Sequence, residues 1–195
     1  MRIHTVRIHN FRCFAGADDK NWSYVFIPNK NLSLLIGPNG TGKSSLLDAI
    51  DLTLNAEGRS NRSLISEYDF PNCDTSKQIS IEVVLTNLGN ALGAFESDIQ
   101  WVDPVDGIPV ETKDIEVEHE LHMKAVIIRF EAGLDDNTGE ITWRWLLPKF
   151  PQTSMVEAKE LSALQHKALG YFRINPAISS GAFSLGRYST LGRHL

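Results

Sequence analysis

The segment from Gly37 to Ser44 reads GPNGTGKS, and it constrains the fold more than any other part of the chain. Its spacing matches G-x-x-x-x-G-K-[ST], a pattern that wraps backbone N–H groups around a phosphate. A short apolar run at 32–36 precedes the segment, and an apolar-rich stretch at 45–54 follows it. We therefore predict a buried strand, a phosphate loop and a helix, in that order, within an α/β nucleotide-binding domain.

Each residue type in this loop has a chemical role. The glycines allow the backbone to approach a phosphate and to adopt positive φ. The N–H groups of about residues 39–45 add to the positive end of the following helix. Lys43 supplies a charge to the β- and γ-phosphates, and the Ser44 hydroxyl is suited to ligate Mg²⁺. The predicted nucleoside triphosphate ligands are Gly37, Pro38, Asn39, Gly40, Thr41, Gly42, Lys43, Ser44 and Ser45.

Length and composition limit the class of protein. A chain of 195 residues suits one sizeable domain. It contains no apolar run near the ~20 residues that span a membrane, so we expect no membrane partner. Its two cysteines, Cys13 and Cys73, have no metal-ligand spacing, which favours a reducing cytoplasm. The net charge of −5 does not indicate a nucleic-acid binder, so any DNA contact requires a local basic patch or a further part of the assembly.

Apolar periodicity predicts the remaining elements. Two strands before the phosphate loop indicate a small antiparallel layer joined to the nucleotide-binding core. A turn at 135–139 (DDNTG) predicts a hairpin between two later strands. The expected strands are 1–9, 21–27, 32–36, 78–85, 115–130 (in two halves), 141–147 and 171–174, and the expected helices are 45–54 and 155–169.

The order of motifs resembles a known group. A strand, the sequence Asn10-Phe11-Arg12-x-Phe14, a second strand and GPNGTGKSSLLDAI are similar to the opening of the SMC/RecF/OLD group of ABC-type ATPases. Three later segments, SEYDFPNCDTSKQISIEVVL, YFRINP and LGRYSTLGRHL, resemble the OLD (overcoming lysogenization defect) family. Proteins of that family commonly carry a C-terminal Toprim nuclease domain.

This resemblance implies a fold and a function. The expected fold is a P-loop NTPase, the N-terminal half of an ABC-type ATPase head, with a mixed sheet and an antiparallel β layer. Residues 1–195 would form one ATP-binding domain, and a helical insertion, the second ATPase half and a Toprim domain would lie beyond 195. The implied cofactors are ATP and Mg²⁺. The implied partners are a second head in a homo-oligomer and, for the full-length protein, DNA. The implied function is an antiphage endonuclease whose ATP-gated head closure controls nuclease action.

The same resemblance implies that this chain alone hydrolyses ATP poorly or not at all. An ABC-type ATPase needs an acidic Walker B pair and an LSGGQ-like signature. The segment AVIIRFE has Arg129 where the metal-binding aspartate should stand, which favours an ordinary strand. The sequence LSALQ at 161–165 lacks the glycines of the signature, and we interpret it as ordinary helix.

The resemblance also assigns two more nucleotide contacts. Arg12 matches a position near the nucleotide, and Asn175 falls where a Q-loop residue would reach Mg²⁺ and the γ-phosphate, with Gln165 as a weaker alternative. For three other groups the ordinary structural interpretation is favoured: His119 and His122 in a strand-like stretch, Trp143 and Trp145 in the core or an interface, and Arg173, Arg187 and Arg193 on a solvated face or dimer contact.

Other classes of protein remain open at this point. An SMC/RecF-like repair ATPase without nuclease, or an ATP-dependent scaffold, would carry the same opening motifs. A transporter nucleotide-binding subunit has a nearly identical phosphate loop. By resemblance to that family, a signature and a Walker B motif should follow the loop, and the sequence after it shows neither. A GTPase or small-molecule kinase is a further alternative, because the stretch from Asp136 to Gly139 imitates D-x-x-G.

Overall fold

The computed structural model describes residues 1–16, 21–29, 31–55, 64–110, 121–149 and 158–170. Within these ranges, no helix has the length and apolar character needed to cross a bilayer. Short 3₁₀ turns are labelled η. The elements are β1 (Arg2–His9), β2 (Tyr24–Phe26), α1 (Lys43–Leu54), η2 (Glu67–Asp69), η3 (Pro71–Cys73), β3 (Ile79–Thr86), η4 (Gly89–Ala91), α2 (Leu92–Phe95), η5 (Glu96–Asp98), β4 (Gln100–Val102), β5 (Met123–Leu134), β6 (Ile141–Leu147), β7 (Lys159–Glu160) and α3 (Ala163–Leu169).

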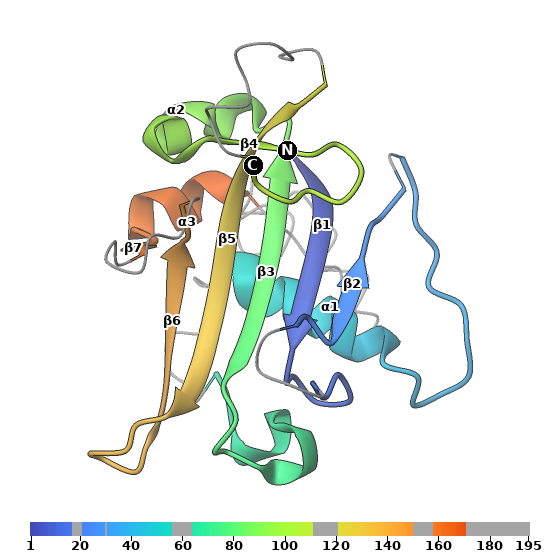
Figure 1. The fold of residues 1–195 in the computed structure, drawn as a ribbon, viewed down its shortest axis with the longest axis vertical. Coiled ribbons are helices and arrows are strands. Elements are labelled where there is room, and N and C mark those ends of the chain that lie inside the picture. The colour runs from blue at the N-terminus through green and yellow to red at the C-terminus, as the bar shows by residue number, and fades with distance from the viewer. Residues whose placement is uncertain (17–20, 30, 56–63, 111–120, 150–157, 171–195) are drawn as a thin grey trace, which may run out of the picture.

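A twisted antiparallel sheet forms the body of the molecule (Figure 1). Its strand order is β2-β1-β3-β5-β6-β7, and β4 pairs separately with β5. This confirms the predicted antiparallel layer. The prediction of a mixed sheet is wrong for the described strands, because every pair among them is antiparallel. The physical reason is that the one expected strand–loop–helix unit contributes its helix but not its strand.

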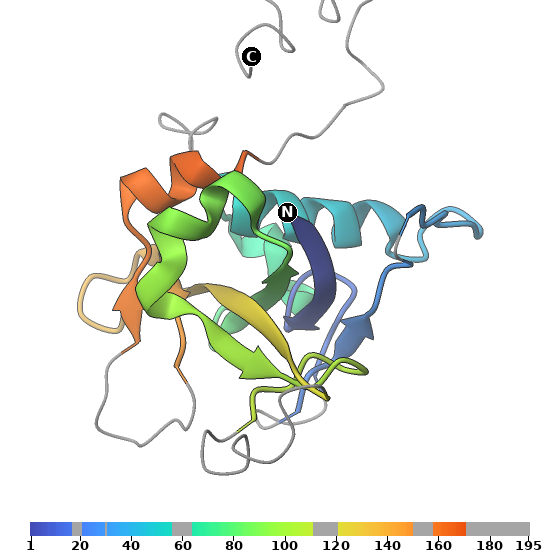
Figure 2. The same ribbon diagram turned by 90° about the horizontal axis from the view of Figure 1, so that it is seen from above.

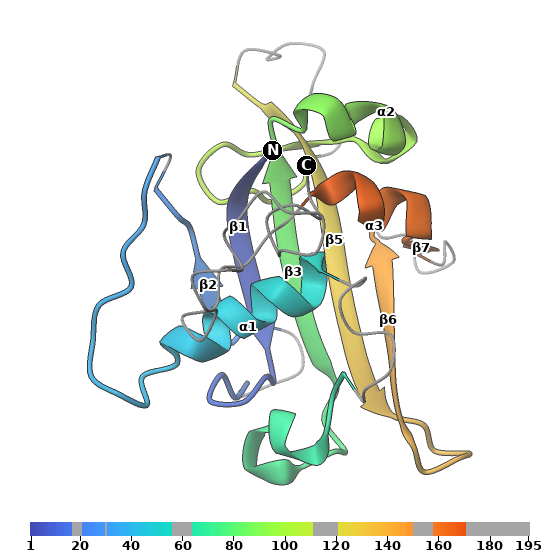
Figure 3. The same cartoon turned by 180° about the vertical axis from the view of Figure 1, so that it is seen from behind.

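One face of this sheet carries the main apolar core. Alternate residues of β3, Ile79, Ile81, Val83 and Leu85, are fully buried, as the period of two in the sequence predicts. They pack with the inward residues of β1 and β5 and with the buried side of α1. Figure 3 shows α1 lying across the near face of the sheet, in front of β1 and β3, so the helix that follows the phosphate loop is fixed on the core.

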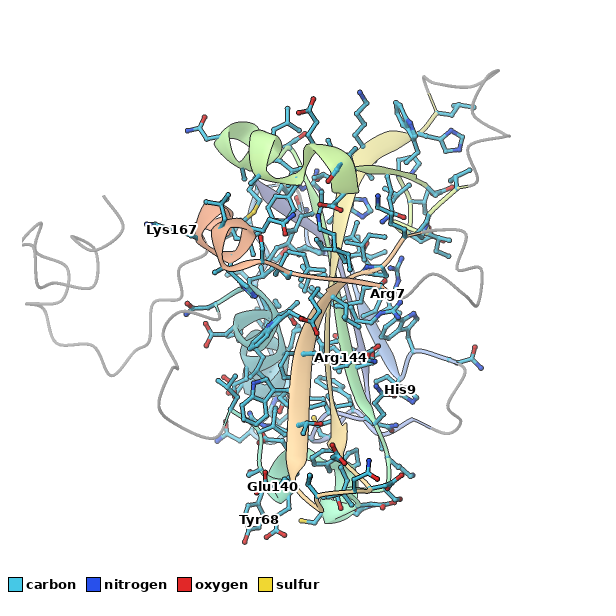
Figure 4. The ribbon with its side chains drawn as sticks, turned by 90° about the vertical axis from the view of Figure 1, so that its left-hand side faces the viewer. Arg7, His9, Tyr68, Glu140, Arg144 and Lys167 are labelled. Atoms are coloured by element: carbon cyan, nitrogen blue, oxygen red, sulfur yellow. The ribbon has the colours of Figure 1, made fainter. Side chains whose placement is uncertain are left out.

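The opposite face carries a row of charged side chains, which we call the charged row. Arg7 donates to Glu82 at 2.5 Å, and Arg129 donates to the other oxygen of Glu82 at 2.8 Å. Arg144 bonds to Glu131 at 2.8 Å in the same way. Figure 4 shows Arg7 on the side of the sheet away from α1. Arg129 therefore belongs to a cross-strand ion network, and AVIIRFE is the ordinary strand that the sequence indicates.

The last predicted helix begins later than expected. Residues 159–160 form β7 and pair with Leu146–Leu147 of β6, and α3 starts only at Ala163. Ser162 caps the helix by accepting from the Gln165 N–H, while the Gln165 side chain accepts from the Ser162 N–H. This capping box sets the start of the helix more strongly than the apolar spacing upstream does. The expected strand at 171–174 lies outside the described residues.

The apolar run before the phosphate loop is not a buried strand, which corrects the central structural prediction. Leu32, Leu34 and Ile36 are 71, 72 and 89% exposed, and the run has no regular secondary structure. Figure 2 shows this part of the chain extending from β2 away from the body to the start of α1. A strand needs hydrogen bonds from a neighbouring strand, and none of the described strands pairs with this run.

Candidate nucleotide-binding site

The phosphate loop joins α1 directly. Gly40 and Gly42 have φ of +80° and +87°, which glycine adopts without the steric penalty of a side chain. Gly42 is the N-cap residue of α1, and its carbonyl accepts the first helical hydrogen bond from Leu46. The N–H groups of the first turn have no partner inside the helix, so they face the loop together with the positive end of the helix dipole. This end of α1 suits an anion.

Lys43 lies over the loop. Its Nζ donates to the carbonyls of Gly37 at 2.9 Å and Pro38 at 2.5 Å, and to the Thr41 hydroxyl at 3.3 Å. An ammonium group has three donors, so all three are used within the loop. An incoming phosphate oxygen must therefore replace at least one of these bonds. The loop holds its own cation in place at the position where negative charge would arrive.

The turn after β1 packs against the loop. A Cβ built on Gly42 would lie 2.9 Å from Cys13 Sγ and 3.0 Å from Phe14 Cζ, so the glycine is required by contact as well as by its φ. The Phe14 ring also stacks on Tyr24 of β2, with centroids 4.7 Å apart and an interplanar angle of 26°. Residues that are far apart in the sequence thus fix one side of the phosphate loop.

Arg12 is bound to two carboxylates. Its guanidinium donates to Asp48 on α1 and, at 2.9 Å, to Asp69 on η2. Burial lowers the pKa of Arg12, and the hydrogen bonds to Asp69 and Asp48 outweigh this and raise it, so the side chain stays charged. The backbone N–H of Arg12 also donates to the Asp69 carbonyl at 2.7 Å. Sequence reasoning placed Arg12 near the nucleotide but missed Asp48 and Asp69, which no local pattern marks.

The structure brings the predicted loop residues together and separates them from Gln165. Residues 37–41 and Ser44 are exposed at the end of α1, whereas Gln165 is buried. Gln165 Nε2 donates to the Ala94 carbonyl and to Asp98, so its role is structural. Asn175, the predicted Q-loop residue, lies outside the described residues, as do Arg173, Arg187 and Arg193.

The other candidates take structural positions. Trp143 and Trp145 pack against the core, and Trp145 Nε1 donates to the Leu52 carbonyl at the end of α1, which confirms their interpretation as packing residues. No set of three or more His, Cys, Asp or Glu side chains is placed to hold a metal ion in the part of the chain that the structure describes. His119 lies outside that part.

Comparison with known proteins identifies the relatives. The model of the family described as "AAA domain" matches residues 5–161, most of the chain. The chain is 38% identical over 81 residues to an OLD nuclease of Thermus scotoductus, covering 42% of the chain and 14% of that protein. It is 38% identical over 50 residues to the DNA replication and repair protein RecF of Prosthecochloris aestuarii, covering 26% of the chain and 12% of RecF.

A further match is to structural maintenance of chromosomes protein 1 of Caenorhabditis elegans, 37% identical over 60 residues, which covers 31% of the chain and 4% of that protein. The matched stretches thus span only a small part of each of these three relatives. The match to the AAA model covers most of β1, the phosphate loop, α1 and the strands from β2 to β7. The chain therefore belongs to the AAA domain family, with ATPases of the OLD, RecF and SMC kind as its relatives.

Proposed function

We propose that this chain is the ATP-binding half of an OLD-type ATPase head. The observation that carries the proposal is the phosphate loop at the start of α1, with positive φ at two glycines and Lys43 bound over its carbonyls. The similarity to an OLD nuclease supports the family. In this proposal the loop N–H groups bind the β- and γ-phosphates, Lys43 neutralises their charge, and the exposed Ser44 hydroxyl is a ligand for Mg²⁺.

The bound Mg²⁺ would supply charge neutralisation at the β- and γ-phosphates. Hydrolysis also needs a group that orients water, and no such group follows from the described site. Arg129 and Glu131, which lie in the segment of β5 that resembles a Walker B motif, belong to the charged row. Figure 4 shows Arg7 of that row on the side of the sheet away from α1. We infer that the chain binds ATP and hydrolyses it slowly by itself.

The exposed run at 32–36 supports a further part of this proposal. Its alternating Leu32, Leu34 and Ile36 have the pattern of a strand that lacks a neighbour. In the proposed protein, the second half of the head supplies that neighbour together with the Walker B and signature residues. Two heads would then close on ATP in a cytoplasmic homo-oligomer. Head closure would control a Toprim nuclease that acts on DNA in antiphage defence. The difference between the affinities of the closed and open heads for ATP would drive this closure.

The experiment that tests the core of the proposal is nucleotide binding by the 195-residue chain. A fluorescent ATP analogue with Mg²⁺ is titrated into wild type, Lys43→Ala and Lys167→Ala. Lys167 is an exposed lysine on α3, away from the loop, so its loss changes the net charge equally (Figure 4). We expect Lys43→Ala to weaken binding about 10- to 100-fold, since it removes a charge-assisted contact.

Lys167→Ala should bind as wild type does. Equal binding by the wild type and Lys43→Ala, or no binding by the wild type, would overturn the proposal. Competition by unlabelled GTP as effective as that by ATP would favour the GTPase alternative instead.

A further inference from the structure

We propose that Asp69 is a positioning residue that holds Arg12 and releases it to the triphosphate when nucleotide binds. The 3₁₀ segment 66–74 would thereby sense occupancy of the phosphate loop. This inference rests on the proposed ATP site, and it adds two residues, Asp69 and Asp48, that lie outside the phosphate-loop motif.

Arg12 lies in the turn after β1, beside the phosphate loop. The next two residues, Cys13 and Phe14, touch the site where a Cβ of Gly42 would stand. Asp48, which accepts from Arg12, is four residues after Ser44 and so lies on the same face of α1, about 6 Å along its axis. The guanidinium is therefore held roughly one helical turn from the predicted phosphate position, within reach of its own flexible side chain.

The backbone has positive φ on both sides of the Arg12–Asp69 contact. Arg12 has φ of +51°, and Asn10 has φ of +53°, a region in which residues other than glycine are uncommon. On the other side of the contact, Asn72 and Cys73 have φ of +56° and +58°. Both segments that meet at the Arg12–Asp69 ion pair are thus held in unfavourable conformations. Such backbone outliers concentrate at sites where a local change has a function.

Asp69 has hydrogen-bond donors other than Arg12. Asp69 binds Arg12 through Oδ1, whereas its Oδ2 accepts from the Ser66 N–H at 3.0 Å and from the Ser66 hydroxyl at 3.1 Å. The carboxylate is therefore still hydrogen-bonded after the guanidinium departs, so the transfer leaves no orphaned charge. The Arg12 side chain is 36% exposed, and pairs with this much exposure are weak.

A triphosphate carries several negative charges where Asp69 carries one. Bound at the loop beside an intact Arg12–Asp48 contact, it would compete for the guanidinium at short range. The Arg12 side chain and the Arg12 backbone N–H both bond to Asp69, and these contacts join η2 to the turn after β1. Loss of the side-chain ion pair leaves the backbone hydrogen bond to hold them together. The segment 66–74, with Tyr68 75% exposed, then becomes less protected. Figure 4 shows Tyr68 at one end of the molecule.

The test compares Asp69→Asn with Asp74→Asn in the same binding assay. Both remove one negative charge from the same segment, but Asp74 contacts Ser76 and does not contact Arg12. We expect Asp69→Asn to bind the ATP analogue about three- to fivefold more tightly than wild type, because a competitor for Arg12 is weakened. Asp74→Asn should leave binding unchanged. In an Arg12→Ala background, Asp69→Asn should give no gain.

Hydrogen exchange on the wild type gives a second readout that does not depend on the folding of a variant. ATP should speed exchange of the N–H groups of Phe70, Cys73 and Asp74, which are hydrogen-bonded within the segment, and it should not do so in Lys43→Ala. Equal affinities of wild type and Asp69→Asn, or unchanged exchange on ATP binding, would refute the inference while leaving the ATP site intact. Absence of ATP binding by the wild type would refute both.

Discussion

Replacing Gly42 by alanine tests the packing of the phosphate loop, and Gly40 provides a matched control. Both residues have similar positive φ, +87° and +80°. A Cβ on Gly42 would meet Cys13 Sγ at 2.9 Å and Phe14 Cζ at 3.0 Å, whereas a Cβ on Gly40 would have nothing within 4 Å. The two substitutions therefore have the same cost of placing a side chain at positive φ, and only Gly42→Ala brings a methyl group against Cys13 and Phe14.

The expected magnitudes follow from these two contributions. A residue with a Cβ costs about 1–2 kcal/mol in this conformation, and this applies equally to both variants. The reduced freedom of the unfolded chain offsets part of the cost, again equally. The extra contacts at Gly42 add about 1–3 kcal/mol, as overpacking does in a filled site. The difference between the two variants should therefore be about 1–3 kcal/mol.

Urea unfolding followed by circular dichroism measures this difference, and the nucleotide titration shows whether the loop still binds. We expect Gly42→Ala to unfold at lower urea than Gly40→Ala. A second substitution, Cys13→Ala, should recover part of the loss in the Gly42→Ala background and none in the Gly40→Ala background, since it removes the sulfur that the new methyl group meets. Equal stability of the two glycine variants would refute the packing of the turn on the loop.

Three other predictions address the thiols, a surface carboxylate and the charged row. ATP should slow modification of Cys13 by a thiol reagent, because a bound anion beside the thiol disfavours the reactive thiolate, and it should leave the modification rate of Cys73 unchanged. Slower modification of Cys73 with an unchanged rate at Cys13 would contradict the site. The Ser76 hydroxyl lowers the pKa of Asp74, so the stabilisation it gives is present at neutral pH and is lost as pH falls through the folded-state pKa; in Ser76→Ala an NMR titration should show that pKa raised toward its ordinary value. Glu82→Gln should lower the free energy of unfolding by about 3–5 kcal/mol, because two arginines lose their shared counter-charge in a buried position, and a loss under about 1 kcal/mol would contradict that role.

The extent to which sequence predicts this fold depends on how local each determinant is. The sequence predicts a strand at 78–85, and the structure confirms it as β3, since β1 and β5 supply its neighbours. Ile79, Ile81, Val83 and Leu85 lie in the main core, and Glu82 and Val84 are buried on the other face. The run at 32–36 has an equally strong apolar character and is exposed. Periodicity reports which residues prefer burial, but it does not report whether a neighbouring strand is present among the same residues.

The candidate site also contains both locally determined and long-range contacts. The loop glycines, Lys43 and α1 follow one another in sequence, so a short motif predicts their association. Arg12 meets its two carboxylates across 36 and 57 residues, and those contacts depend on how the turn after β1 and the segment 66–74 settle on the helix. No short pattern contains that information, and the role of Arg12 as a nucleotide contact stays a prediction from the resemblance.

The local origin of the phosphate-binding groups affects nucleotide binding. The groups that recognise phosphate are formed locally at the start of α1, so they exist before the run at 32–36 finds a neighbour. That run enters the loop directly at Gly37, whose carbonyl holds Lys43. Pairing of the run with another strand would restrict the backbone on the entry side of the loop, as α1 already restricts the exit side. Affinity for ATP and completion of the sheet are thus expected to be thermodynamically linked, each favouring the other by the same coupling free energy.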